Sequence, residues 1–139
     1  MFEDNDYKLY VIVNRNAEIS VQMNAVGHLC GGIMLKAEEP KFHDYLNQDS
    51  GLSAYMNHYP VVVLQSKNSS QLATALEKCK EEGVLYNFFT TTMLSHSSEQ
   101  QIKDTLEAPF AGLDFVAIAL YGETEKLKPV TKKFSVFKG

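Results

Sequence analysis

The stretch LDFVAIALYG, residues 113–122, is the longest strand-like run in the sequence. Its apolar residues occupy consecutive positions rather than every second position, which is typical of a strand that is buried on both faces. It therefore predicts an interior strand of a sheet with helices on both sides. Three earlier apolar runs, at residues 9–14, 60–65 and 84–89, predict further buried strands, and the alternating run 133–138 predicts a last, half-exposed strand.

Helical patterns alternate with these strands. After Ser20, apolar residues recur at three- and four-residue steps, which predicts a helix with Ser20 as its N-cap. The glycines at 27, 31 and 32 predict either close backbone packing or a helix that ends near Gly31. A second helix is predicted from the N-cap Asn68 to a glycine C-cap at Gly83, and a third opens at Ser97.

The mixed, polar stretch 36–58 predicts a turn of helix near 40–47 followed by a loop. The alternation of strands and helices over the whole chain predicts an α/β fold, a three-layer sandwich with a mixed four- to five-stranded sheet and helices on both faces. At 139 residues with 45% hydrophobic content, we expect a single domain over residues 1–139 with its core at about 7–138.

Charge and cysteine usage narrow the class of protein. Thirteen basic and seventeen acidic residues give a net charge of -4, and Arg15 is the only arginine, which argues against a nucleic-acid partner. Cys30 and Cys79 lie in helical patterns, which predicts small buried hydrophobes and a reducing compartment. The acidic start and the absence of a long apolar run predict a cytoplasmic protein that does not enter membranes.

The common catalytic and cofactor motifs are missing. Neither GxxxxGK[ST] nor GxGxxG occurs, which disfavours a nucleotide site. No GxSxG elbow is present, and no CxxC or HxxxH supplies metal ligands at useful spacing. We therefore expect no cofactor and no metal.

Two polar clusters are candidates for a site. Asn24 and His28 are four residues apart and share one helix face, where His28 could act as acid, base or donor. The alternative is a histidine at the edge of the core that bonds a loop carbonyl. The second cluster follows the third strand, where open α/β sheets bind ligands, although a helix N-terminus also needs such hydroxyls. It consists of Thr90, Thr91, Thr92, Ser95 and His96.

Two further features are less specific. Ser53, in the loop DSGLS before the strand predicted at 60–65, is an additional candidate ligand contact. Five lysines lie between residues 126 and 138 and could meet an acidic partner or a phosphate. The alternative is a solvated sheet edge whose charge discourages aggregation.

The order of elements resembles the bacterial domain of unknown function 2000 family over residues 7–138. The segments that carry the resemblance are KLYVIVN, NAVGHLCGG, DSGLSAYMNHYPVVVLQ, GVLYNFF, FVAIALYG and PVTKKFSVFK. Its most specific pieces are His28, Gly51, Ser53 and the LYG at 120–122. The family is similar in fold to type 2 peptidyl-tRNA hydrolase, which implies a mixed sheet of four or five strands with helices on both faces.

The resemblance does not extend to the catalytic residues of the hydrolase. When the two sequences are aligned at His28, the lysine and the glutamine of the hydrolase are replaced by Val21 and Ala25. The aspartate position of the hydrolase falls near Thr91. Gln22 is one residue away from the lysine position and points about 100° from it. Valine and alanine cannot orient water or stabilise an oxyanion.

Two classes of function remain. The first is a binding or interaction module, compatible with a homodimer, that takes a small molecule or a protein through Asn24, His28, Ser53 and Thr92. The second is a divergent hydrolase acting on a peptidyl-tRNA-like or other small ester or amide, with His28 as acid or base and Thr91 or Thr92 as donor or weak nucleophile. The first is favoured because no activated nucleophile and base can be placed together.

Overall fold

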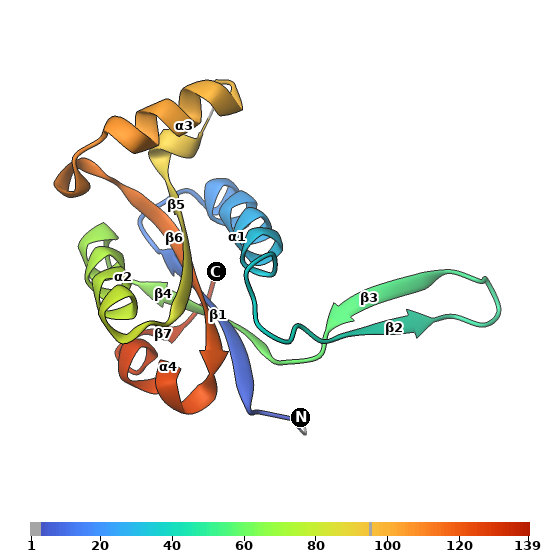
Figure 1. Cartoon of the computed structure of the whole chain (residues 1–139). Coiled ribbons are helices and arrows are strands. Elements are labelled where there is room, and N and C mark those ends of the chain that lie inside the picture. The colour runs from blue at the N-terminus through green and yellow to red at the C-terminus, as the bar shows by residue number, and fades with distance from the viewer. Residues whose placement is uncertain (1–3, 95) are drawn as a thin grey trace.

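The computed structural model describes residues 4–94 and 96–139 (Figure 1). Ser95 of the predicted threonine-rich cluster lies outside the described residues. In chain order the elements are β1 (Tyr7–Asn14), α1 (Ile19–Ile33), β2 (Phe42–Leu46), β3 (Ser53–Asn57), β4 (Val61–Ser66), α2 (Ser69–Glu82), β5 (Leu85–Thr90), the 3₁₀ turn η1 (Thr91–Met93), α3 (Ser98–Glu107), the 3₁₀ turn η2 (Phe110–Gly112), β6 (Phe115–Glu123), α4 (Thr124–Thr131) and β7 (Ser135–Val136).

The main sheet is mixed, with the strand order β5-β6-β1-β4-β7. β1 and β4 are parallel, whereas β6 is antiparallel to both β1 and β5, and β7 is antiparallel to β4. The run that predicted an interior strand forms β6, in which each residue from Phe115 to Tyr121 is buried. The predicted α/β class with a mixed sheet is therefore confirmed.

Helices cover both faces of this sheet because the side chains of each strand alternate between the faces. The odd-numbered β1 residues Leu9, Val11 and Val13 pack with α1. Ile12 points to the opposite face and packs in a cluster with residues of α2 and α4. The result is a three-layer arrangement in which α1 lies on one side of the sheet and α2 and α4 lie on the other (Figure 1).

The boundaries of α2 agree with the sequence. The side chain of Asn68 accepts a hydrogen bond from the backbone N–H of Gln71, and the Gln71 side chain in turn accepts from the backbone N–H of Lys67 at 2.8 Å. Gly83 ends the helix in the left-handed region, with φ 70°, which glycine adopts without a steric penalty. Both predicted caps are confirmed.

The predicted start of α1 was wrong. The helix begins at Ile19, the N-cap residue is Glu18, and no side chain caps this end. The backbone N–H of Gln22 already bonds the Glu18 carbonyl at 2.9 Å, so Ser20 lies inside the first turn. The helix also continues past Gly31 to Ile33. At Gly32 an added Cβ would lie 3.0 Å from the Asn87 amide nitrogen, so glycine here permits close packing on β5.

The prediction for residues 36–58 was also wrong. β2 and β3 form an antiparallel hairpin, called the arm below and comprising residues 42–57, that projects from the body of the molecule (Figure 1). The aromatic residues Phe42 and Tyr45 in FHDYL favour a strand, and Gly51 takes φ 79° in the connecting turn. Every residue of β2 is exposed, so the chain's own core does not explain this element.

The C-terminal region holds a helix that the sequence did not predict. α4 packs Leu127 and Val130 against the sheet, although Pro129 lies inside it. Pro129 has no N–H to donate to the Glu125 carbonyl four residues earlier, so this short helix lacks one of its intrahelical hydrogen bonds. The final strand, predicted over 133–138, is confined to Ser135–Val136, where it pairs with Leu64 and Gln65 of β4.

Candidate functional site

The carboxyl ends of β1, β4 and β5 lie at one edge of the sheet, because these three strands run in the same direction. α1 leaves β1 toward one face and α2 leaves β4 toward the other. Such a divergence is where open α/β sheets place their ligands. A crevice of about 420 Å³ lies here, lined by Thr91 together with Asn14, Ser69 and Asp114.

The other threonines of this loop bond one another. The hydroxyl of buried Thr90 lies 2.6 Å from that of Thr92, which lies 2.8 Å from that of Thr105. The Thr105 hydroxyl donates its proton to the Gln101 carbonyl at 2.8 Å, so it accepts the hydrogen bond from the Thr92 hydroxyl. The Thr92 hydroxyl in turn accepts from the Thr90 hydroxyl. Each proton of this chain is already used. Thr92 can therefore accept a hydrogen bond from a ligand but has no proton left to donate.

The remaining candidates from the sequence lie elsewhere. Asn24 and His28 are both exposed on α1, and the His28 ring stacks on Phe89 with centroids 5.9 Å apart. Ser53 is the first residue of β3, on the projecting arm (Figure 1). The structure thus distributes the predicted site residues among the crevice, the surface of α1 and the arm. It does not bring them into one pocket.

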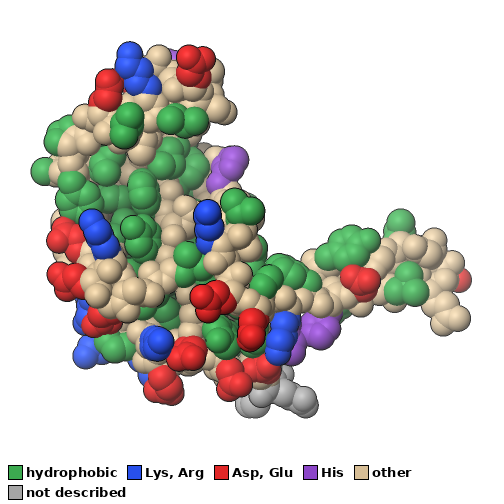
Figure 2. Space-filling model, viewed as in Figure 1, with side chains coloured by type: hydrophobic (Ala, Val, Ile, Leu, Met, Phe, Trp, Pro, Cys, Tyr) green, Lys and Arg blue, Asp and Glu red, His purple; other side chains and the backbone are tan. Residues whose placement is uncertain are grey.

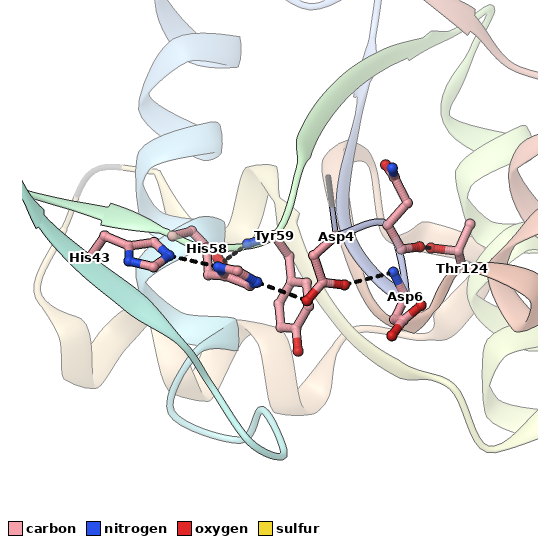
Figure 3. A network of polar contacts seen from close by, with 8 residues as sticks. Asp4, Asp6, His43, His58, Tyr59 and Thr124 are labelled. Carbon is pink, nitrogen blue, oxygen red and sulfur yellow. Dashed lines mark hydrogen bonds and ion pairs between the residues drawn. The ribbon is translucent and has the colours of Figure 1, made fainter. Parts of the chain in front are cut away.

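The base of the arm holds a chain of polar contacts that the sequence did not reveal. The Nε2 atom of His58 lies 2.8 Å from the Asp4 carboxylate, and its Nδ1 atom lies 2.6 Å from Nε2 of His43 (Figure 3). A carboxylate only accepts, so His58 Nε2 carries the proton that is donated to Asp4. In the neutral state His58 Nδ1 is then the acceptor and His43 Nε2 the donor. The order of the relay is Asp4, His58, His43.

This relay can orient an imidazole and move a proton, but it lacks a nucleophile. In a catalytic triad the position beyond the imidazole is held by a hydroxyl or a thiol. Here it is held by a second imidazole. Hydrogen bonding to His58 is the main reason that the pKa of the Asp4 carboxyl is lowered below 3.8, with smaller support from the Asp6 backbone N–H.

We expect His58→Ala to raise the pKa of the Asp4 carboxyl toward 3.8, because the largest cause of its lowering is removed. In the wild type the stabilisation by this pair is present above pH 3.8 and is lost as the pH falls through the lower pKa of the folded state. A carbon-detected NMR titration of the side-chain carboxyls measures this directly. His43→Ala is the control, because it leaves the Asp4 contact in place. A low Asp4 pKa that persists in His58→Ala would contradict the assignment.

A cluster of tyrosine rings packs against His58 of the relay. The rings of Tyr7 and Tyr59 are 5.2 Å apart, those of Tyr7 and Tyr121 are 5.8 Å apart, and His58 meets Tyr59 edge-on at 4.9 Å. The Tyr121 hydroxyl is buried and has no hydrogen-bond partner among the described residues. Burial is the main cause that raises the pKa of Tyr121 to about 12. The cluster therefore holds the base of the arm through packing of neutral rings.

A cavity of about 780 Å³ lies on the α2 side of β5. In Figure 2 hydrophobic side chains gather on this part of the surface, between α2 and α3. Phe115 forms its base, with the rings of Phe88 and Phe110 5.8 Å and 6.1 Å away. This cavity, called the aromatic groove below, is lined by Leu76, Glu77, Lys80, Glu81, Tyr86, Phe88, Phe110, Leu113 and Phe115.

The groove exists because β5 is the edge strand of the sheet. α2 closes one side, and the η2 turn with Phe110 closes another, but the outer half of β5 stays open. The sequence contains a weak signal for it, since Tyr86 and Phe88 are two apart and so share one face of a strand. Their pairing with Phe110 could not be seen, because it depends on where the η2 turn returns to the sheet.

Two kinds of feature are missing from residues 4–94 and 96–139. No group of three or more His, Cys, Asp or Glu side chains there has the arrangement needed to hold a metal ion. Among the same residues, no helix combines the length and the apolar character needed to cross a membrane.

Comparison with known proteins gives one family and one fold. The profile of a protein family described as "Protein of unknown function (DUF2000)" matches residues 7–138. The structure is similar to that of a protein of unknown function from Agrobacterium tumefaciens strain C58, with a TM-score of 0.85 and 16% sequence identity over 97% of this chain and 100% of that chain. At this identity the similarity shows the fold alone. No curated protein matches the sequence.

Proposed function

Because the chain belongs to the DUF2000 family, whose description assigns no activity, we propose a function from its own surface: it is a binding module that takes an apolar, ring-bearing small molecule in the aromatic groove. The family inferred from the sequence is the one that matches. The observation that carries the proposal is the groove itself, which has the size and the apolar lining of a small-molecule site.

The lining supports a planar or branched apolar ligand. Phe88 and Phe110 both contact the ring of Phe115, so a ligand ring entering between them can stack or pack edge-on. Phe110 is 49% exposed, an unusual position for so large an apolar side chain when no ligand covers it. Burying the open half of this ring is the main gain that binding would bring.

The rim adds a constraint on the polar end of the ligand. Among the described residues that line the groove, Lys80 is the only basic one, and Glu77 and Glu81 lie beside it on the same helix. An anionic group can reach the Lys80 ammonium, but a ligand with several negative charges would also face the two carboxylates. The rim therefore favours a ligand with at most one negative charge.

We expect Phe110→Ser to weaken binding of the dye anilinonaphthalene sulfonate by about tenfold, since it removes the exposed ring from the groove. The dye carries fused rings and one sulfonate, and its fluorescence increase on titration reports the affinity. Ile102→Ser is the matched control, because Ile102 is an exposed apolar residue of α3 that does not line the groove. No binding to the wild type, or equal affinity in both variants, would contradict the proposal.

The finer fold assignment is also a proposal: we infer a type 2 peptidyl-tRNA hydrolase-like fold, supported by the mixed five-stranded sheet with helices on both faces. Thr91 in the crevice keeps a divergent hydrolase as the second candidate, with Thr91 as the donor. Two observations argue against a hydrolase. His28 stacks on Phe89, and Val21 and Ala25 occupy the positions of the hydrolase's lysine and glutamine. Turnover of an N-acyl-aminoacyl-tRNA that is lost in Thr91→Val would favour this candidate over the binding module.

A further inference from the structure

The arm exposes apolar side chains that its own chain does not cover (Figure 2). Because paired residues of an antiparallel ladder share a face, the register divides these side chains into two sets. Phe42, Leu46 and Tyr55 lie on one face together with Asp44. This face, called the apolar arm face, exposes 52%, 67% and 70% of its three large apolar residues in the order given.

The arm is also too small to hold this conformation by itself. Its two strands have five residues each, and an isolated two-stranded hairpin is marginal in water. The body meets the arm at its base, through His58 and through the Asn57 amide, which lies 3.6 Å from the Met34 sulfur. Asn57 shares a face with Phe42, so the apolar arm face turns toward the α1 side of the molecule.

A matching surface lies on the α1 side of the main sheet. α1 packs over β1, β5 and β6 and leaves the half formed by β4 and β7 without a helix. Val61 and Val63 point to this side, because they pair with Leu9 and Val11, which pack with α1. Phe137 lies beside them, its N–H donating to the Val63 carbonyl at 3.0 Å. These three residues are called the open sheet face.

The arm is acidic, and a lysine follows the open sheet face in the sequence. The arm contains Asp44 and Asp49 and no lysine or arginine between residues 42 and 57. The open sheet face is next to the lysine-rich C-terminal segment, with Lys138 following Phe137 directly and its N–H reaching the Gln65 side chain at 3.4 Å. Lys138 is therefore near enough to meet the acidic residues of an arm that covers this face.

We propose that two copies of this chain form a dimer in which each apolar arm face covers the open sheet face of the other copy. Because both surfaces belong to the same chain, a two-fold axis lets each copy give and receive one arm, and the assembly closes. The arm's base adjoins β4, so the donating and receiving surfaces are continuous in each copy.

The area is sufficient for a stable dimer. At the exposed fractions given above, each of the three apolar side chains offers about 100 Å². The two arms offer about 600 Å² through these side chains, and with the equal area that they cover on the other copy the dimer buries about 1,200 Å², the lower end of the range for specific interfaces. The backbone and polar side chains of the arm add to this area.

The first test is the mass in solution, measured by light scattering after size exclusion. We expect a dimer for the wild type and a monomer for a variant in which residues 42–57 are replaced by a short Gly-Ser turn. The core clusters contain no residue of the arm, so the shortened chain should keep a cooperative unfolding transition. A monomeric wild type, which would assign the arm to a different partner, or a dimeric shortened chain would overturn the proposal.

Point variants separate the two faces of the arm without deleting it. Tyr55→Ser should weaken the dimer at least about tenfold in sedimentation experiments, whereas Tyr45→Ser, on the opposite face and exposed to a similar degree, should change it less than about threefold. Equal effects of the two substitutions would contradict the assigned face.

Cross-linking distinguishes arm on sheet from arm on arm. In a Cys30→Ser background, a mixture of Tyr55→Cys and Val61→Cys chains should give covalent dimers with a bismaleimide, and Tyr55→Cys alone should not. Cys79 is 0% exposed and should not react. Cross-linking of Tyr55→Cys alone would show that the arms pack on each other, and would overturn the proposed interface.

Discussion

Phe115→Ala is expected to lower the free energy of unfolding by about 3–5 kcal/mol, the range for removing a buried phenylalanine ring. Phe115 is 1% exposed and packs against Phe88 and Phe110 at the point where the core meets the aromatic groove. The smaller side chain leaves a cavity that the β6 backbone cannot fill, because each residue from Phe115 to Tyr121 is buried.

Urea unfolding followed by circular dichroism and extrapolated linearly measures this effect. Phe110→Ala is the matched control, since it removes the same ring from a site that is 49% exposed, and it should cost less than about 1.5 kcal/mol. If both substitutions cost the same, Phe115 would not be the residue that joins the groove to the core.

Asn14→Leu is expected to cost about 2–3 kcal/mol, although the two side chains are similar in size. Buried Asn14 donates from Nδ2 to the Phe115 carbonyl at 3.0 Å and accepts from the backbone N–H of Asn16 at 3.0 Å. Leucine can do neither, and the carbonyl of buried Phe115, left without this partner, costs about 1–3 kcal/mol. The same urea experiment measures the loss.

Asn14→Asp separates the hydrogen bond from the packing. Its carboxylate can accept from Asn16 but faces the Phe115 carbonyl without a proton to donate. Burial and this contact should raise its pKa above the ordinary value of about 3.9. The variant should therefore be most stable at low pH, where the protonated acid donates, and lose stability as the pH rises through the raised pKa. A loss of stability on acidification, relative to wild type, would contradict the assigned donor.

The arm shows where prediction from sequence stopped. Neither FHDYL nor SAYMN alternates apolar and polar residues as a half-buried strand does, and a polar turn joins the two segments. Propensity alone did not separate them from a loop. A strand in a core is recognised by the apolar residues that it buries, and this hairpin buries none in its own chain. Its stability depends on surfaces outside the hairpin.

The two sites found in the structure also had no signal in local spacing. Asp4, His43 and His58 are separated by up to 54 residues and meet only because the first strand begins beside the base of the arm. The groove residues likewise come from α2, β5 and the η2 turn. By contrast, Thr91 could be placed at a ligand-binding edge, because the end of a strand is a local property of the chain.

The sequence by itself determined the α/β class, the capped helix α2, the interior position of β6 and the family. Burial on both faces, helix caps and strand ends depend on residues that are neighbours in the sequence. The tertiary structure alone decided the order of the strands, the projection of the arm, the relay at its base and the open groove beside β5. These features depend on which distant segments meet and which faces remain uncovered. Local periodicity records which side of an element is apolar, but it does not record what covers that side.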